Sequence, residues 1–327
     1  MSGWAATGPV SMTGPSPVKW QPPSHHLDPR YTAAGDVYLI GHLGVAQIDP
    51  AGWRLRVDGL VDTPLEIGLD DLRAMGSEPV TATLECFGNP LDPEVPVRRV
   101  ANLRWRGVPV RTVLERAGVR PGATSVWATG LDHGEFAGEY CTEYRKDLPL
   151  DVVLERGLLA HELDDGPLPA ERGYPVRLVV PGFFGTNNVK WLGRLTLADH
   201  RPEHLFTTRL YLRPSPDGMV PVREMDVNSL LTAPADGADV DSDVEVAGWA
   251  WGFEPVARVE VAVDGRWGQA EVEPRAPGPP TWQRFRARRV LVAGAHEIAV
   301  RATDRAGVTQ PLDAARNAVH RVRILVR

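Results

Sequence analysis

Cysteine is scarce in this sequence, which has two, Cys86 and Cys141, among 327 residues. Secreted disulfide frameworks depend on several bridges, so this composition favours a reducing compartment, and we expect a cytoplasmic protein. The opening stretch MSGWAATGPVSMTGPSP lacks a charged start, a continuous apolar segment and a twin-arginine pair, which predicts no export signal. The sequence also lacks any run of about 18 apolar residues, so we expect no membrane-spanning helix.

Positive charge is not in excess either. Lys and Arg number 36 against 42 Asp and Glu, a formal charge of −6 that would repel a polyanion, and we expect no nucleic-acid partner. Hydrophobic residues make up 43% and charged residues 24%, as in ordinary folded proteins. The length exceeds what one core usually supports, which predicts about two domains.

The first domain is expected to mix helices and strands. Residues 1–34 are rich in Pro and Gly and show no period, which predicts an extended arm. Over residues 35–205, strand-like alternation at 53–59 and 80–84 is interrupted by helical spacing at 69–75 and 108–117. No strict βαβ rhythm is present, so we predict an α+β arrangement in which a mixed α/β domain comes first.

The pattern changes after about residue 205. Alternating apolar and polar residues recur at 244–250, 257–263, 296–301 and 319–326, and Asp264-Gly265 is a turn signal between two of these segments. Short alternating strands at this spacing predict an antiparallel β-sandwich of immunoglobulin-like type over residues 206–327, without the usual Cys pair.

Cys86 is the residue most suited to chemistry. It follows the β-rich run 80–84 and begins a Gly-Asn-Pro turn, so its thiol is expected at a strand end beside a loop, where sites are commonly built. From the residue alone, a small buried hydrophobic side chain is the commoner role for a single cysteine.

The segment around Cys86 resembles a known motif. Residues 84–89, LECFGN, are similar to the LxCxGN segment of the sulfite oxidase family, and residues 158–182 and 189–192 resemble two further segments of that family in the same order. Residues 246–251, VAGWAW, and 258–261 resemble its dimerisation domain. The resemblance extends from about Tyr38 to the C-terminus.

The resemblance implies a molybdenum–molybdopterin cofactor and a homodimer. In this family the matching cysteine ligates molybdenum, so Cys86 is the predicted metal ligand and, with Tyr144 beside the metal, a predicted catalytic residue. The predicted cofactor-binding residues are His42, Asp132, Arg172, Arg177 and Lys190. In isolation His42, Asp132, Arg177 and Lys190 are more or equally typical of a polar loop, a turn, a strand face or a solvated surface.

The implied reaction is a two-electron oxygen-atom transfer on a small sulfur compound. Molybdenum prefers soft sulfur donors, which a dithiolene and one thiolate supply. The electrons would pass to an external acceptor that the sequence does not identify.

The chain departs from the family's pattern where sulfite oxidising members bind their anion. Those members carry arginine and asparagine where this chain has Ile40 and Gly41, and two arginines where it has Pro90 and Leu91. We therefore predict an altered anion pocket, with sulfite as the first candidate substrate and a less anionic sulfur compound as the second. Arg98, Arg99, Arg145 and Lys146 are candidates to replace the lost cations.

Other functions remain open at this point. The absence of these arginines is also consistent with a non-catalytic family member whose pocket has changed and which acts as a binding or interaction protein. A reductase of a neutral S-oxide is a further alternative. A hydrolase that uses Cys86 with His42 or His161 has no local nucleophile signature in its favour.

Overall fold

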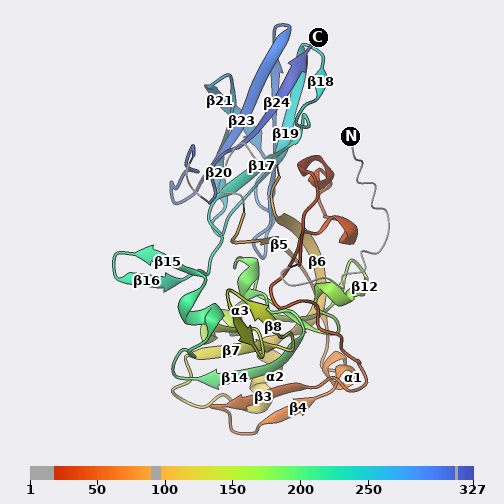
Figure 1. The fold of residues 1–327 in the computed structure, drawn as a ribbon, viewed down its shortest axis with the longest axis vertical. Coiled ribbons are helices and arrows are strands. Elements are labelled where there is room, and N and C mark those ends of the chain that lie inside the picture. The colour runs from red at the N-terminus through yellow and green to blue at the C-terminus, as the bar shows by residue number, and fades with distance from the viewer. Residues whose placement is uncertain (1–17, 90–96, 314–315) are drawn as a thin grey trace.

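The computed structural model describes residues 18–89, 97–313 and 316–327. These residues form an elongated molecule with two parts along its long axis, one with mixed strands and short helices and one built of strands (Figure 1). The predicted mixture of helices and strands is therefore confirmed. Within the described residues, no helix is both long enough and apolar enough to cross a membrane.

One sheet of the mixed part lies at the end of the molecule farthest from the all-β part. Its strand order is β10 (Arg145–Pro149), β7 (Ser125–Gly130), β14 (Leu192–Ala198), β3 (Leu55–Gly59) and β4 (Leu65–Ile67), with only β14 and β3 parallel. Helices α2 (Val110–Ala117) and α3 (Leu150–Arg156) pack together against the same core. The alternating residues of β3 explain this arrangement, because Leu55 and Val57 are buried while Arg56 is exposed.

A second sheet connects this end to the all-β part. It comprises β12 (Gly166–Pro167), β11 (Leu158–Leu163), β6 (Val100–Pro109) and β5 (Glu78–Glu85), and β13 (Arg177–Val179) also pairs with β11. Helix α1 (Leu69–Arg73) precedes β5. Strand β5 ends one residue before Cys86, so the predicted placement of this cysteine at a strand end is confirmed.

Short elements fill the space around the two sheets. Strand β1 (Val18–Trp20) pairs with β2 (Leu39–Gly41), β8 (Gly134–Phe136) with β9 (Glu139–Cys141), and β15 (Leu212–Ser215) with β16 (Gly218–Pro221). Single turns of helix are η1 (Ser24–Leu27), η2 (Ala34–Asp36), η3 (Ala170–Arg172), η4 (Gly185–Asn187) and the π-type η5 (Leu205–Arg209). Several of these carry cavity residues described below.

The described residues of the all-β part form eight strands. They are β17 (Asn228–Ala233), β18 (Asp239–Val240), β19 (Asp243–Trp251), β20 (Val256–Val263), β21 (Arg266–Val272), β22 (Gln283–Val290), β23 (Gly294–Asp304) and β24 (His320–Val326). Their order is β17-β19-β22-β21-β20-β23-β24-β18. Apolar residues of β19 and β22 pack with those of β20, β23 and β24 in one core, as the alternating patterns predicted.

Residues 18–34 of the predicted arm pack over the junction between the two parts. The indole of Trp249 donates a hydrogen bond to the Leu27 carbonyl at 2.8 Å, and that of Trp282 donates to the Arg30 carbonyl at 2.9 Å. Leu27 is fully buried in a cluster that includes both tryptophans. Residues 1–17 of the arm lie outside the described residues.

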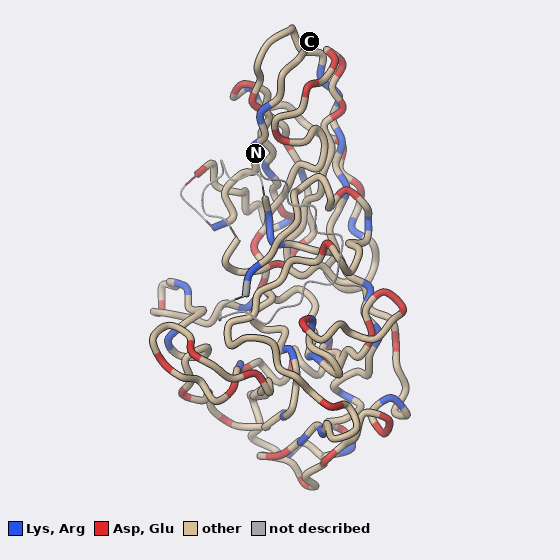
Figure 2. The backbone as a smooth tube through the Cα atoms, turned by 45° about the vertical axis from the view of Figure 1, so that its right-hand side comes forward, with Lys and Arg blue, Asp and Glu red and all other residues tan. Residues whose placement is uncertain are grey.

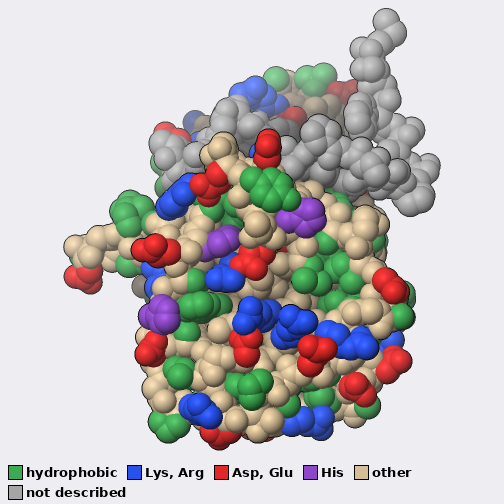
Figure 3. Space-filling view, turned by 60° about the horizontal axis from the view of Figure 1, so that its bottom comes forward, with side chains coloured by type: hydrophobic (Ala, Val, Ile, Leu, Met, Phe, Trp, Pro, Cys, Tyr) green, Lys and Arg blue, Asp and Glu red, His purple; other side chains and the backbone are tan. Residues whose placement is uncertain are grey.

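Charges of both signs are spread over the surface. Figure 2 shows basic and acidic residues interspersed along both parts of the chain, in keeping with the small net charge. In Figure 3 basic side chains form a band across the face of the mixed part, interrupted by acidic ones.

Gly107 offers a test of the packing between β6 and β11. A Cβ atom there would lie 2.6 Å from the Cα of Ala160 and closer still to the Leu159 carbonyl oxygen. Gly107→Ala is therefore expected to lower the free energy of unfolding by about 1–3 kcal/mol, because two backbones must separate. Urea unfolding followed by circular dichroism measures the change.

Gly166→Ala is the matched control in the same sheet, since its Cβ would meet only the Leu163 carbonyl oxygen, at 3.9 Å. Equal stability of the two variants would contradict the described packing of β6 on β11.

Candidate active site

The turn that carries Cys86 is fixed to the start of β6. The Cys86 N–H donates to the Arg99 carbonyl at 2.9 Å, and the Asn89 side-chain oxygen accepts from the Arg99 N–H at 2.7 Å. The Cys86 side chain is half-buried, and desolvation raises the pKa of its thiol, while the Gly88 backbone N–H acts in the opposite direction. The backbone is thus held while the sulfur stays accessible from one side.

All of the predicted site residues line one cavity. Its empty space, including the open mouth, is about 790 Å³. The residues come from the ends of separate elements: His42 follows β2, Asp132 follows β7, Tyr144 precedes β10, Arg172 ends η3, Arg177 begins β13, and Lys190 precedes β14. Cys86 joins them from the end of β5. Residues up to 148 positions apart in the sequence, such as His42 and Lys190, therefore share one site.

Basic side chains form one wall of this cavity. Arg177 donates to the carbonyls of Arg172 and Asn188, each at 3.0 Å, and its guanidinium lies 5.1 Å from the centre of the Trp105 ring. Arg172 donates to the Tyr38 carbonyl at 2.5 Å. Both guanidinium groups are buried, and desolvation lowers the pKa of each to about 10.

Lys190 and Asp132 complete this wall. The Lys190 ammonium donates to the carbonyls of Ile40 at 3.0 Å and Glu171 at 3.3 Å. Desolvation and the charge of Arg177 lower the pKa of Lys190, whereas desolvation raises the pKa of Asp132 against the attraction of Lys190. This wall can bind an anion, because the negative charge would offset the repulsion among the cations and compensate for their loss of solvation.

Aromatic rings surround His42. The ring centres of Phe136, Tyr144, Phe206 and Tyr211 lie between 4.9 and 5.8 Å from that of the imidazole. The Tyr211 hydroxyl is hydrogen-bonded to His42 Nε2. Desolvation, with the charge of Lys190, lowers the pKa of His42 to about 3, so the imidazole is neutral near pH 7.

Tyr144 is buried with its hydroxyl held by Thr186. The Tyr144 hydroxyl lies 2.8 Å from both the carbonyl oxygen and the side-chain oxygen of Thr186. Desolvation raises the pKa of this phenol, so it stays protonated and can donate a hydrogen bond.

Several cavity residues were missed in the sequence. Tyr38, Trp105, Thr186 and Asn188 also line the cavity, as does Tyr211, which has a positive φ of 58°. Tyr211 lies in a segment without periodicity, and no sequence signal points to it. Asn188 directly precedes the family-like segment 189–192, so a closer comparison around that segment could have found it.

The proposed replacement cations do not line the cavity. Arg98 donates to the Ala318 carbonyl at 3.2 Å, and Lys146 donates to the Phe206 carbonyl at 2.7 Å. Arg99 bonds the Gly88 carbonyl and Arg145 pairs with Glu143. Ile40 does line the cavity, whereas Pro90 and Leu91 lie outside the described residues. The arginines lost from the family's pattern are thus not replaced by any of these four side chains.

Comparison with known proteins agrees with this site. Residues 42–206 match the model of the oxidoreductase molybdopterin binding domain, and residues 220–324 match that of the Mo-co oxidoreductase dimerisation domain. The chain belongs to the sulfite oxidase family. Mitochondrial sulfite oxidase of Mus musculus is 34% identical over 288 residues, which cover 79% of this chain and 52% of that protein. The chain thus spans about half the length of this relative.

Two further members of the family extend the comparison. Nitrate reductase [NAD(P)H] of Hordeum vulgare is 29% identical over 92% of this chain and 39% of its own length. The crystal structure of the sulfane dehydrogenase SoxCD from Paracoccus pantotrophus superposes with a TM-score of 0.79 at 27% identity, covering 97% of this chain and 85% of that chain. The sheet-rich fold is therefore similar to that of this solved structure.

The cavity fits the molybdenum–molybdopterin group that the family implies. The Nε atoms of Arg172 and Arg177 and one carboxylate oxygen of Asp132 are buried without hydrogen-bond partners among the described residues. Such atoms are expected to find a partner, and a phosphorylated pterin offers both acceptors and donors.

The neutral state of His42 can be tested through pH. Between about pH 6.5 and 3 the unfolded chain binds a proton at His42 that the folded chain excludes, so stability falls as pH falls. Without cofactor, His42→Asn is expected to lose less stability than the wild type between about pH 7 and pH 4. Urea unfolding at several pH values measures this difference.

His133→Asn, which changes an exposed histidine, is the control and should follow the wild type. A His42→Asn variant with the same acid sensitivity as the wild type would show that His42 is protonated in the folded state.

Proposed function

We propose that this protein is a molybdenum-dependent oxidoreductase that performs two-electron oxygen-atom transfer on a small sulfur compound. Over a full turnover the substrate sulfur gains one oxygen atom that comes from water, two protons are released, and two electrons leave to an external acceptor. The observation that carries the proposal is the convergence of the Cys86 thiol, a neutral aromatic region and a basic wall on one cavity. The names of the mouse and Paracoccus relatives, sulfite oxidase and sulfane dehydrogenase, support a sulfur substrate.

Five cavity residues have a proposed role in holding the cofactor. Cys86 would supply the protein's sulfur ligand, because molybdenum in an oxidised state prefers soft donors. Arg172, Arg177 and Lys190 would bind the phosphate of the cofactor through charge-assisted hydrogen bonds, and Asp132 would accept hydrogen bonds from the pterin. When bound, the cofactor supplies the oxygen atom and takes up the two electrons.

The chain's own aromatic residues would then orient the substrate. Tyr144 would turn its hydroxyl hydrogen from the Thr186 carbonyl to a substrate oxygen, and His42 stays neutral beside it, with its ring centre 5.8 Å away. The cavity residues with cationic side chains are Arg172, Arg177 and Lys190, all on the proposed cofactor side, while Phe87, Ile40 and Tyr211 are uncharged. This distribution favours a sulfur compound with less negative charge than sulfite.

The all-β part is proposed to serve assembly. We infer that residues 206–327 form an immunoglobulin-like domain through which two chains make a homodimer, that residues 35–205 form the catalytic domain, and that residues 1–34 are an arm. The match of residues 220–324 to a dimerisation domain supports this division. The cytoplasmic location stays a prediction, consistent with two free cysteines.

Replacement of Cys86 tests the proposed function directly. Cys86→Ser is expected to reduce turnover by at least about 100-fold, because groups that merely support a metal ligand already contribute 10–100-fold. Molybdenum content, circular dichroism and steady-state assays with sulfite and with neutral sulfur compounds measure the effect.

Cys141→Ser is the matched control, since Cys141 is also a free cysteine but does not line the cavity. Unchanged turnover of Cys86→Ser would refute the mechanism. Wild-type protein without molybdenum, made in a host that synthesises the cofactor, would instead favour a binding protein.

A second substitution tests the altered anion pocket. Ile40→Arg returns a cation to the position where sulfite oxidising members carry one, and we expect it to lower the KM for sulfite roughly tenfold, because charge-assisted hydrogen bonds are strong. Steady-state kinetics with sulfite and with a neutral sulfur compound measure the shift.

Ile40→Met keeps the apolar character and serves as the control. The KM for the neutral compound should not fall in either variant. An equal KM for sulfite in the Arg and Met variants would show that position 40 does not contact the substrate.

A further inference from the structure

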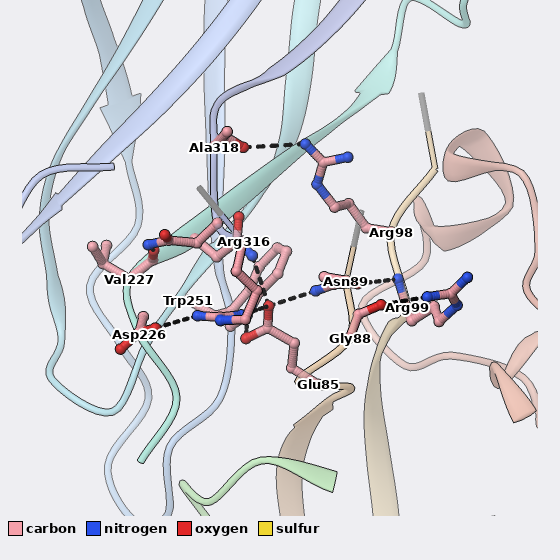
Figure 4. A network of polar contacts seen from close by, with 12 residues as sticks. Glu85, Gly88, Asn89, Arg98, Arg99, Asp226, Val227, Trp251, Arg316 and Ala318 are labelled. Carbon is pink, nitrogen blue, oxygen red and sulfur yellow. Dashed lines mark hydrogen bonds and ion pairs between the residues drawn. The ribbon is translucent and has the colours of Figure 1, made fainter. Parts of the chain in front are cut away.

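A buried carboxylate lies directly beside the cysteine turn. Glu85 ends β5, immediately before Cys86, and its side chain has no exposed surface. It lies outside the cavity and points toward the all-β part (Figure 4). A buried carboxylate is costly unless donors surround it, so the source of its donors is informative.

Two of these donors come from the all-β part. The Asn228 side-chain amide on β17 donates to Glu85 Oε1 at 2.6 Å, and the Trp251 indole on β19 donates to Oε2 at 3.0 Å. Asn228 is itself held by Gln310, whose amide donates to the Asn228 oxygen at 3.0 Å. The carboxylate is therefore bound to a rigid sheet and not to a loose loop.

Arg316 adds a charge to the same network. Its guanidinium lies 3.6 Å from Glu85 Oε1 and is also paired with Asp226 (Figure 4). It further lies over the rings of Phe87, at 5.0 Å, and Phe184, at 4.4 Å. Glu85 and Phe87 are the two neighbours of Cys86 in the chain, so Arg316 contacts the residues on both sides of the thiol.

Glu85 in turn closes the cysteine turn. The Asn89 side-chain amide donates to Glu85 Oε1 at 2.5 Å, and the same Asn89 accepts from the Arg99 N–H at 2.7 Å. The residues from Glu85 to Asn89 thus form a turn that is closed by a hydrogen bond between its two ends. Cys86 is part of this turn, and the donors of the all-β part bind Glu85 from outside the turn.

We propose that Asn228, Trp251 and Arg316 are positioning residues for the Cys86 thiol. They hold Glu85 and Phe87 from the all-β part, and these two residues fix the direction in which the sulfur faces the cavity. This gives the all-β part a role in the site beyond assembly. The positioning of the thiol by these contacts does not depend on the proposed function. Any influence of the same contacts on bound molybdenum rests on the proposed function.

A comparable network that does not reach Cys86 provides the controls. On the same strand as Trp251, the buried indole of Trp249 donates to the Leu27 carbonyl of the arm at 2.8 Å. Arg284 pairs with Asp28 of the arm at 2.7 Å and lies 4.9 Å from the centre of the Trp249 ring. Trp249 matches Trp251 in type and burial but donates to a backbone carbonyl, whereas Arg284 matches Arg316 in type, burial and its pairing with a carboxylate.

The main experiment measures the reactivity of Cys86 in full-length protein made without cofactor. Iodoacetamide alkylation is followed by peptide mass spectrometry, with the buried Cys141 as an internal reference. Trp251→Phe is expected to raise the alkylation rate of Cys86 by on the order of tenfold relative to Cys141, because hydrogen bonds to charged groups are among the stronger ones. Trp249→Phe should leave this ratio unchanged.

Arg316 is tested in the same way. Arg316→Met should raise the alkylation rate of Cys86 relative to Cys141. Arg316→Lys should bring this ratio most of the way back to the wild-type value, since lysine keeps a charge near Glu85 and Phe87. Arg284→Met, the control, should change thermal stability without changing the ratio.

The outcomes separate positioning from general stabilisation. Equal ratios in Trp251→Phe and Trp249→Phe, or in Arg316→Met and Arg284→Met, would overturn the proposal, as would a parallel rise for Cys86 and Cys141. In holoprotein, Trp251→Phe should also broaden or shift the molybdenum(V) electron paramagnetic resonance signal. If the ratio rises in Trp251→Phe and Arg316→Met while Cys86→Ser retains molybdenum and activity, the positioning role is supported and the proposed function is refuted.

Discussion

Buried positive charge in one cavity is the constraint on which this structure depends. Arg172 and Arg177 are 6% and 5% exposed, Lys190 lies beside them, and Asp132 is the acidic side chain among the described residues that line the cavity. Their hydrogen bonds go largely to backbone carbonyls, and the Nε atoms of Arg172 and Arg177 have no hydrogen-bond partner among the described residues. Such a wall is stable when an anion completes it, which is the physical reason that the cavity suits a phosphorylated cofactor.

The fold meets this constraint by placing the ends of many elements at one location. Strands β2, β5, β7, β10, β13 and β14 each begin or end near a cavity residue, while their apolar interiors form separate cores. The all-β part packs against the same region through Trp249, Trp251 and Trp282. The cysteine turn therefore lies between the two parts of the chain, and the buried carboxylate of Glu85 joins them.

Local sequence signals predicted the parts of the site that lie in continuous motifs. Cys86, Arg177 and Lys190 belong to segments whose order along the chain is specific, and the alternation in β3, β19, β20 and β23 predicted those strands. Tyr211 and the partners of Glu85 could not be predicted in the same way, because their contacts join positions far apart in the sequence. The link between Glu85 and Trp251 spans 166 positions and depends on how the two parts dock.

The proposed function depends on a bond between the Cys86 sulfur and molybdenum. X-ray absorption spectroscopy at the molybdenum edge of the purified full-length protein detects this bond. We expect a thiolate sulfur at bonding distance in addition to the dithiolene pair, and the loss of that one scatterer in Cys86→Ser. An identical sulfur shell in the wild type and Cys86→Ser would contradict it.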